Sequence, residues 1–422
     1  MPELKMLTKR IGDINPLSID DAIKNDSYKQ LEKAIKMDAI DLIEEVKVAN
    51  LRGRGGAGFP MHIKMMSVAK EDSRPKYLVC NADEGEPGNF KDKYLMENDP
   101  HSVIEGILIA AYTVGATKGY IYIRGEYNQA ISIMKYAVEE AKNKGFIGEN
   151  ILGTDYSFDL EIKRGAGSYV VGEEFAMIES IEGKAGRTRV KPPFPSDVGV
   201  FGKPTLLNNV ETFCNLPFIV DMGGKEFKKI GTETSTGTKL ISLSGNIKNP
   251  GVYEVPFGTT LRTAINELGG GVKGGERIKM VQLGGACGPI IPEMMLDLQI
   301  DYDRFEDFET KTGAGAIIVM DERQDIFDVL LRISRFFEHE SCGRCTPCRE
   351  GNVHIEKLLR KFVDYTGTSE DLFKLESLAR VMHQTSLCGL GQSSPISIIS
   401  SLGYFRDEYH ERMMVDGGGN LD

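Results

Sequence analysis

Three cysteines at strict three-residue intervals constrain this chain more than any other feature of its sequence. Cys342, Cys345 and Cys348 stand in "ESCGRCTPCREG", and Cys388 follows in "SLCGLG". Structural zinc sites usually present two separate ligand pairs, whereas C-x2-C-x2-C with one remote cysteine is the spacing that holds the corners of a [4Fe–4S] cluster. The spacing therefore favours a cluster over a zinc clip, disulfides or buried free thiols, and the two arginines of the first stretch are expected to tune its reduction potential.

The bulk composition limits the class of protein. Cys80, Cys214 and Cys287 lie in apolar or glycine-rich stretches, which predicts small core residues. Seven cysteines without a recognisable signal peptide predict reduced thiols and a cytoplasmic location. The formal net charge of −11 argues against nucleic acid as a partner. No apolar run reaches the roughly 20 residues of a membrane span, so no direct membrane insertion is expected.

The pattern of predicted helices and strands changes twice along the sequence, which predicts a multidomain α/β protein of three units. Residues 18–50 have a helical pattern with Ser18 and Asp26 as candidate N-caps, and strand-like and helix-like segments then alternate from 76 to 236, as in a Rossmann-like sheet. Short strands, glycine turns and one helix at 259–268 predict a small β-grasp unit, and four amphipathic segments then predict a helical bundle. The predicted boundaries are 1–236 for the N-terminal helices and α/β domain, 237–323 for the β-grasp domain, 324–415 for the helical bundle with the cluster, and 416–422 for a disordered tail.

Several loops of the predicted α/β domain carry residues suited to a nucleotide. The stretch "LRGRGGAGFP" (51–60) offers backbone N–H groups that can cradle a phosphate, with Arg54 and Lys64 to supply positive charge. The stretch "NADEGEPG" (81–88) gathers carboxylates that accept hydrogen bonds from sugar hydroxyls. Taken alone, the first is better explained as a flexible loop and the second as a solvated acidic turn.

Further stretches favour a nucleotide site over separate, unrelated loops. In "GAGSYVVGEE" a glycine loop leads into a helix that opens with Glu173 and Glu174, which alone is ordinary compensation of the helix dipole. Asn208 and Asn209 in "NNVET" offer adjacent amides that suit a ring edge with both donors and acceptors. The stretch "KPPFP" adds a lysine and an aromatic ring. Four such loops in one domain predict a composite pocket for a flavin and a dinucleotide.

These stretches together resemble one family. "GRGGAGFP", "NADEGEPG", "GAGSYVVGEE", "KPPFP", "NNVET" and the cysteine stretches are similar to the NADH-binding FMN subunit (51 kDa) of respiratory complex I, over about residues 45–415. NAD-linked hydrogenases and formate dehydrogenases share this module. The resemblance implies FMN at the base of an open cavity, hydride exchange with NAD(H) and one-electron transfer to a [4Fe–4S] cluster. The β-grasp unit resembles the ubiquitin-like SLBB module of the family.

The resemblance also implies roles for individual residues. Phe59, Glu86, Glu174, Lys191 and Phe194 would border NADH, with Glu86 and Glu174 as the catalytic residues, and the four cysteines would ligate the cluster. Because Glu174 would lie near the ribose hydroxyls, it predicts NAD over NADP. The cofactor-binding residues carried over are Gly53, Arg54, Gly55, Gly56, Phe59, Lys64, Asn81, Asp83, Glu84, Tyr169, Gly172, Glu173, Glu174, Lys191, Phe194, Asn208, Asn209 and Thr212.

One departure concerns the adenine. The family continues from its glycine loop as Lys-Trp-Ser-Phe, whereas here the lysine is followed by Met65, Met66 and Ser67. The phenylalanine expected to stack on adenine is therefore missing, which leaves Phe59 and Phe194 for that contact.

Partners follow from the resemblance as well. It implies a thioredoxin-like [2Fe–2S] subunit and a further iron–sulfur or catalytic subunit. The sequence leaves open whether the parent assembly is complex I or a hydrogenase or formate dehydrogenase, including one that bifurcates electrons. An alternative of a different class is a non-catalytic scaffold that only relays electrons through its cluster.

Overall fold

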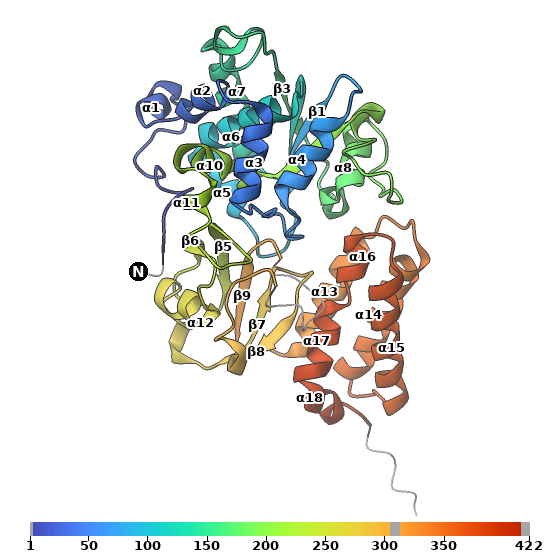
Figure 1. Ribbon diagram of the computed structural model, residues 1–422. Coiled ribbons are helices and arrows are strands. Elements are labelled where there is room, and N and C mark those ends of the chain that lie inside the picture. Colours follow the sequence, from blue (N-terminus) through green and yellow to red (C-terminus); the bar gives the residue numbers. More distant parts are fainter. Residues whose placement is uncertain (1–2, 304–312, 415–422) are drawn as a thin grey trace, which may run out of the picture.

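The computed structural model describes residues 3–303 and 313–414, arranged as three units (Figure 1). An α/β unit lies at the top of the view, a β-grasp unit at the lower left and a helical bundle at the lower right. The multidomain α/β prediction is therefore confirmed. The residue boundaries between the units stay predictions, and the expected disordered tail lies outside the described residues.

A four-stranded parallel sheet forms the centre of the α/β unit. Its strand order is β3-β2-β1-β4, with β1 (Tyr77–Ala82), β2 (Lys118–Ile123), β3 (Asp159–Arg164) and β4 (Thr205–Asn209). The chain builds outward from β1 to β3 and then returns to the other side of β1, so the strand order reverses between β1 and β4. In sheets of this kind, ligands bind outside the carboxyl ends of the strands at such a reversal.

Helices cover both faces of this sheet (Figure 1). The most buried is α6 (Pro100–Val114), whose sequence is apolar on nearly every side, so that it is enclosed by neighbouring helices and β1. Asp99 caps its first turn and Gly115 ends it at φ 69°. The other helices of the unit are α1 (Ile19–Lys24), α2 (Lys29–Ala34), α3 (Ala39–Val48), α4 (Met61–Lys70), α5 (Lys91–Asn98), α7 (Asn128–Asn143), α8 (Glu174–Ile181), α9 (Val210–Cys214), α10 (Leu216–Met222) and α11 (Gly224–Phe227).

The two N-cap predictions had different outcomes. Ser18 caps α1 by accepting the N–H of Asp21 at 3.2 Å. Asp26 caps no helix, because α2 begins after Tyr28, which has φ 65° and no side-chain cap. The ring of Tyr28 is buried and stacked on Phe146 at 4.0 Å. Long-range packing, rather than a local capping side chain, therefore sets the start of this helix.

The β-grasp unit is a mixed five-stranded sheet in the order β6-β5-β9-β7-β8. The predicted hairpin at 249–251 joins β5 and β6, and the predicted helix at 259–268 is present as α12 followed by a π-helical turn. The elements are β5 (Thr238–Gly245), β6 (Gly251–Pro256), α12 (Leu261–Thr263), the turn Ala264–Leu268, β7 (Ile278–Leu283), β8 (Ile290–Pro292) and β9 (Ala316–Asp321).

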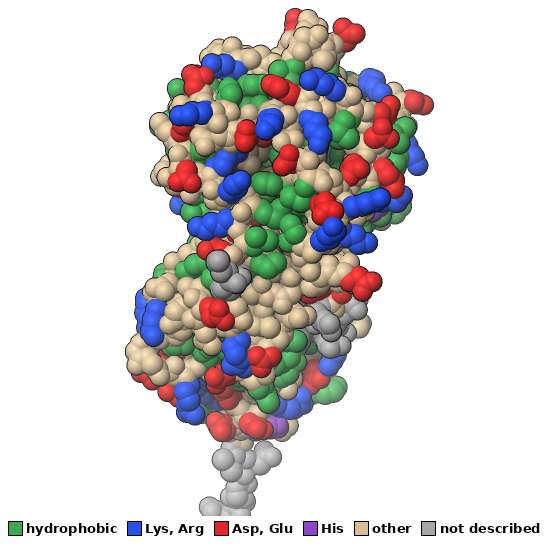
Figure 2. Space-filling view, turned by 60° about the vertical axis from the view of Figure 1, so that its left-hand side comes forward, with side chains coloured by type: hydrophobic (Ala, Val, Ile, Leu, Met, Phe, Trp, Pro, Cys, Tyr) green, Lys and Arg blue, Asp and Glu red, His purple; other side chains and the backbone are tan. Residues whose placement is uncertain are grey.

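A strap and an apolar waist connect this unit to the α/β unit. The N-terminal segment reaches down to β6, where the carboxylate of Glu254 accepts the N–H groups of Met6, Leu7 and Thr8, each at 2.9 Å. Charged side chains of both signs are interspersed over the visible face, and hydrophobic side chains gather at the waist between the two units (Figure 2).

The C-terminal unit is a helical bundle, as predicted. Its core includes the rings of Phe327, Phe362 and Tyr409, whose centroids lie 4.7–5.8 Å apart. The last predicted amphipathic segment is broken into two helices at Phe405. The helices are α13 (Ile326–Glu340), α14 (Thr346–Val363), α15 (Ser369–Thr385), α16 (Gly389–Ser393), α17 (Ile396–Tyr404) and α18 (Arg406–Glu411).

Candidate active site

The glycine loop lies at the carboxyl end of β4. Its two ends are held together, because the N–H of Gly53 donates to the carbonyl of Phe59 at 2.9 Å. Gly55 packs directly on Asn209, since a Cβ at Gly55 would lie 3.2 Å from the Asn209 Cβ. Gly56 has φ 123°, which a side chain would strain. The loop therefore presents backbone at the reversal of the strand order, as a cofactor cradle requires.

Two buried polar atoms at the same edge of the sheet have no partner. Within the described part of the chain, Oδ2 of Asp83 and Nδ2 of Asn208 make no hydrogen bond. Asp83 is only 9% exposed, and burial raises its pKa to about 7 although Arg124 opposes the shift. An unpaired buried acceptor and donor are costly unless a ligand satisfies them. Ribityl hydroxyls and the ring edge of a flavin carry the matching groups, so these residues fit FMN.

Asn81 connects β1 to the second glycine loop. Its Nδ2 donates to the carbonyl of Gly172 at 2.9 Å, and its Oδ1 accepts the N–H of Asp83 at 3.1 Å. These bonds join the acidic loop to the loop before α8. The glycine loop adjoins them through Asn209, which contacts Gly55 and donates to the carbonyl of Asn81 at 3.3 Å.

Two glutamates and two lysines form a charge-balanced group beside this edge. Glu173 caps α8 through the N–H groups of its first turn, and its Oε1 lies 3.1 Å from Lys191 Nζ. Glu174 lies 2.5 Å from Lys191 and 3.3 Å from Lys64. Burial raises the pKa of Glu174, but the two lysines outweigh it and hold the pKa below its usual value. Glu174 is therefore a paired carboxylate in this structure, not the free one assumed in the argument for NAD over NADP.

Glu86 joins the α/β unit to the β-grasp unit. Its Oε2 accepts the hydroxyl of Tyr169 at 2.5 Å, and its Oε1 accepts the N–H of Cys287 at 3.0 Å. Burial raises the pKa of Glu86. Cys287 was expected in the core, but it is only partly buried and lines a cavity with Glu86 and Tyr169. A thiol within the glycine-rich stretch "GGACGP" was the sequence signal for this position.

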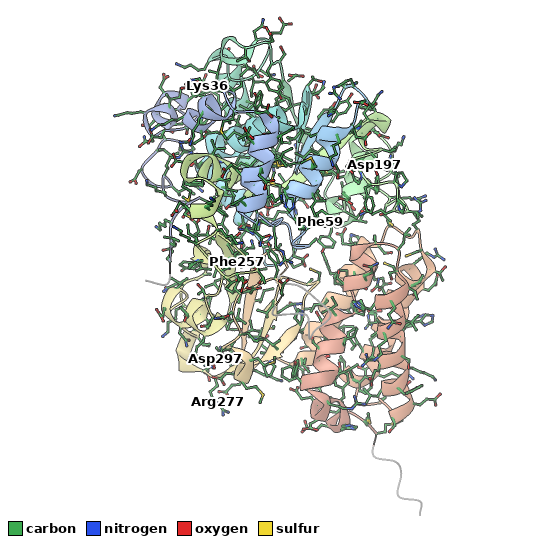
Figure 3. The ribbon with its side chains drawn as sticks, in the orientation of Figure 1. Lys36, Phe59, Asp197, Phe257, Arg277 and Asp297 are labelled. Atoms are coloured by element: carbon green, nitrogen blue, oxygen red, sulfur yellow. The ribbon has the colours of Figure 1, made fainter. Side chains whose placement is uncertain are left out.

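The structure gives Arg54 and Thr212 roles different from the predicted ones. Arg54 is completely buried, donates to the carbonyl of Thr236 at 2.6 Å and stacks on Phe257 at 4.7 Å. Phe257 lies where the α/β and β-grasp units meet (Figure 3). The hydroxyl of Thr212 accepts the N–H of Arg54 at 2.8 Å. Both side chains thus fasten the glycine loop from behind rather than supply charge to a phosphate.

Asn209 is also engaged within the fold. Its Nδ2 donates to Asp92 at 2.6 Å and to the carbonyl of Asn81 at 3.3 Å. Its Oδ1 accepts from Lys91 at 3.2 Å and from the N–H of Glu211 at 3.1 Å. The neighbouring amide, Asn208, is the one that keeps a free donor.

The acidic loop is not the solvated turn that the simpler interpretation expected. Asp83, Glu84 and Glu86 are all buried. The carboxylate of Glu84 accepts the N–H groups of Asp92 and Lys93, both at 3.0 Å, at the start of α5. Glu84 therefore caps a helix, while the other two carboxylates face the site.

Two aromatic rings are exposed near the paired lysines. Phe59 is 46% exposed and Phe194 is 50% exposed, and Phe59 lies on the side of the α/β unit that faces the bundle (Figure 3). Met65 is completely buried, and Met66 packs against the same core. Ser67 stands where the family has the phenylalanine, and its hydroxyl donates to the carbonyl of Ile63 at 2.9 Å. Phe59 and Phe194 therefore stay the predicted contacts for adenine.

The four cysteines of the bundle lie together. Cys348 is buried, which raises its pKa to about 11, and the nearby thiols of Cys345, Cys388 and Cys342 add to the shift. Among the described residues, no group of three or more His, Cys, Asp or Glu side chains is gathered for a single metal ion. Four neighbouring thiols are the donor set of a [4Fe–4S] cluster, so these residues fit it.

The two arginines of the cysteine stretch do not point freely at the thiols. Arg344 donates to the carbonyl of Thr188 in the α/β unit, and Arg349 donates to the carbonyl of Gly343 at 2.8 Å. Their expected influence on the reduction potential stays a prediction.

One cavity connects all three units. It has a volume of about 370 Å³. Its lining includes Gly55 and Tyr169 of the α/β unit, Cys287 of the β-grasp unit, and Gly389, which follows the fourth cysteine. The glycine loop and the residue that follows the fourth cysteine therefore line the same space.

Comparison with known protein families gives three matches along the chain. Residues 46–218 match the Nuo51 FMN-binding domain, residues 240–291 match the SLBB domain, and residues 328–412 match the NADH-ubiquinone oxidoreductase-F iron-sulfur binding region. A subunit of the NADH-quinone oxidoreductase of Aquifex aeolicus is 45% identical over 97% of this chain and 94% of its own length. The chain belongs to the family of 51 kDa flavoprotein subunits.

Hydrogenases contain members of this family too. The HndC subunit of the NADP-reducing hydrogenase of Solidesulfovibrio fructosivorans is 44% identical over 96% of this chain and 83% of its own length. The crystal structure of an NAD+-reducing [NiFe]-hydrogenase in the H2-reduced state superposes with a TM-score of 0.86 at 33% identity, over 98% of this chain and 67% of that chain. The chain is thus an NADH dehydrogenase component of a multi-subunit oxidoreductase, with FMN, NAD(H) and a [4Fe–4S] cluster as cofactors.

Proposed function

We propose that the carboxyl edge of β1 and β4 holds FMN and that the mouth formed by Phe59, Phe194 and the paired lysines receives NAD(H). When bound, the flavin exchanges a hydride with NAD(H) and single electrons with the cluster. The observation that carries this assignment is the pair of unpartnered buried atoms on Asp83 and Asn208, beside a glycine loop that a Cβ would obstruct.

Each part of the chain then has a physical task. Asp83 accepts hydrogen bonds from hydroxyls of the cofactor, and Asn208 donates a hydrogen bond to an acceptor on it. Lys64 and Lys191 keep Glu174 ionised, which orients its carboxylate toward hydroxyl donors of the dinucleotide. The charges of Glu173 and Glu174 are balanced by those of Lys64 and Lys191. The negatively charged dinucleotide can therefore enter without strong repulsion.

The assignment is tested by reconstituting the chain with FMN and titrating it with NADH. We expect flavin fluorescence to be quenched on binding and the flavin absorbance to bleach with NADH. An Asn208→Leu variant should lose FMN affinity about tenfold or more, because an acceptor on the cofactor is then buried without a donor. A protein that takes up iron and sulfide but never binds FMN would instead support the relay scaffold.

Selectivity for NAD over NADP stays a prediction. Glu174 would disfavour a 2′-phosphate if its charge acts alone, but Lys64 and Lys191 lie within 3.3 Å of it. We expect NADH to be preferred in wild type. In Glu174→Gln, we expect the preference for NADH over NADPH, measured as the ratio of the two kcat/KM values, to be smaller than in wild type. Equal kcat/KM values for the two dinucleotides in wild type would contradict the predicted selectivity for NAD.

The partners and location are proposals as well. A multi-subunit assembly is shown by the relatives, and we propose a thioredoxin-like [2Fe–2S] subunit and a further iron–sulfur or catalytic subunit as its components. Reduced thiols support a cytoplasmic location. Among the described helices, none combines the length and apolar character needed to cross a membrane. Purification under native conditions, followed by identification of the bound subunits, distinguishes complex I from a hydrogenase or formate dehydrogenase.

A further inference from the structure

The segment that carries the first cysteine is tied to the α/β unit on both of its sides. Before Cys342, the Oε2 of Glu340 accepts the backbone N–H of Tyr169 at 2.8 Å. After Cys342, Arg344 donates to the carbonyl of Thr188, which is buried. Both hydrogen bonds cross from the bundle to the α/β unit, so Cys342 lies between two fixed points on the flavin side.

The position of Glu340 is unfavourable for its own helix. It is the last residue of α13, where the negative end of the helix dipole disfavours a carboxylate. Among the described residues, the side chain of Glu340 makes one hydrogen bond, to the N–H of Tyr169. The helix itself therefore does not favour a glutamate at this position. The hydrogen bond to Tyr169 in the α/β unit does.

Tyr169 connects Glu340 to the predicted active site. Its hydroxyl donates to Glu86, and its ring lies 5.1 Å from Phe336 on the same helix as Glu340. A Cβ at Gly85 would lie 3.0 Å from the Tyr169 ring, so the tyrosine is packed against the acidic loop. Any displacement of Glu340 is thus transmitted to a residue that lines the shared cavity.

We propose that Glu340 and Arg344 are positioning residues that fix the separation between the flavin site and the [4Fe–4S] cluster. This proposal rests on the proposed function, because it needs FMN at the α/β edge. With both cofactors bound, NADH would lose one hydride to the flavin and become NAD+. The two electrons of that hydride would pass one at a time to the cluster and on to the partner subunit, and its proton would go to solvent. The two hydrogen bonds act chiefly on the transfer of electrons to the cluster.

The test compares Glu340→Ala with Glu340→Gln, whose side-chain oxygen still accepts an N–H. Glu338→Ala is the matched control, because it removes a carboxylate from the same end of α13. In the cofactor-free chain, exchange of the Tyr169 amide hydrogen should be about tenfold faster in Glu340→Ala than in wild type. The Glu340→Gln and Glu338→Ala variants should exchange as wild type does.

In the reconstituted protein, stopped-flow mixing with NADH separates the two stages. Flavin bleaching should change less than cluster reduction in Glu340→Ala, Arg344→Ala and the double variant. Reduction of the cluster should slow a few-fold in Glu340→Ala and further in the double variant, because the rate of electron transfer falls as the two cofactors move apart. Glu340→Gln should keep the wild-type rate. Unchanged Tyr169 exchange, or cluster reduction at the wild-type rate in all variants, would overturn the proposal. A wild-type protein that NADH does not bleach would overturn the proposed function instead.

Discussion

Replacing Asp83 by asparagine should stabilise the cofactor-free protein at neutral pH while weakening its affinity for FMN. Asparagine has nearly the same shape and keeps one acceptor, but it carries no charge. The Asp83 carboxyl is 9% exposed, and burial raises its pKa from 3.8 to about 7. Folding therefore imposes a neutral carboxyl on a group that the unfolded chain ionises near pH 4.

The sign and size follow from that shift. A group whose pKa is raised by folding contributes its full stability at low pH and loses it as the pH rises toward the folded pKa. At about 1.4 kcal/mol per pKa unit, Asp83 should cost wild type about 3 kcal/mol of unfolding free energy between pH 5 and pH 8. The Asp83→Asn variant should lack this part of the pH dependence.

The assay is urea unfolding of the cofactor-free chain at pH 5 and pH 8, with FMN affinity measured by fluorescence at pH 8. We expect FMN to bind the variant about tenfold to a hundredfold more weakly, because a charge-assisted hydrogen bond is lost. In wild type, FMN should bind more tightly as the pH rises through 7, since its hydroxyl donors favour the ionised carboxylate.

Glu105→Gln is the matched control for Asp83→Asn. Glu105 is also buried, with a pKa raised to about 7 by burial. It lies in α6, and its carboxylate accepts the N–H groups of Gln30 and Leu31, away from the site. Its variant should change the pH dependence of stability and leave FMN binding alone. Equal stability differences between Asp83→Asn and wild type at both pH values, or weaker FMN binding by Glu105→Gln, would refute the reasoning.

Three other perturbations have defined outcomes. Cys388→Ser should lower the iron and sulfide content measured after reconstitution, whereas Cys214→Ser, in the apolar core, should not; equal losses would contradict the ligand assignment. Lys191→Met removes the nearer partner of Glu174, so the pKa of that carboxyl should rise and the KM for NADH should increase at low pH in steady-state assays, with a pH-independent KM as the opposing result. Glu211→Gln leaves two buried lysines without their shared carboxylate and should cost roughly 3–5 kcal/mol in urea unfolding; a loss below about 1 kcal/mol would show that the network is not needed for stability.

The regular features of the fold were predictable because they depend on local sequence. The order of strands and helices, the hairpin at 249–251 and the four-segment bundle follow from hydrophobic periodicity and turn residues. The cap of α2 did not follow, because the buried ring of Tyr28 determines where that helix starts. Capping rules describe one turn of backbone and carry no information about a stacked ring more than a hundred residues away.

The cysteine spacing by itself favoured a [4Fe–4S] cluster over zinc, disulfides or free thiols, since the ligand set lies within one short segment and one remote thiol. The glycine, acidic and amide stretches predicted a nucleotide pocket only when taken together, because each alone has a simpler explanation. Only the tertiary structure decided which side chains face that site: it turned Arg54, Glu84 and Asn209 inward and left Asp83 and Asn208 with free atoms. The physical reason is that burial and hydrogen-bond completion depend on segments brought together from distant parts of the chain, which no local pattern specifies.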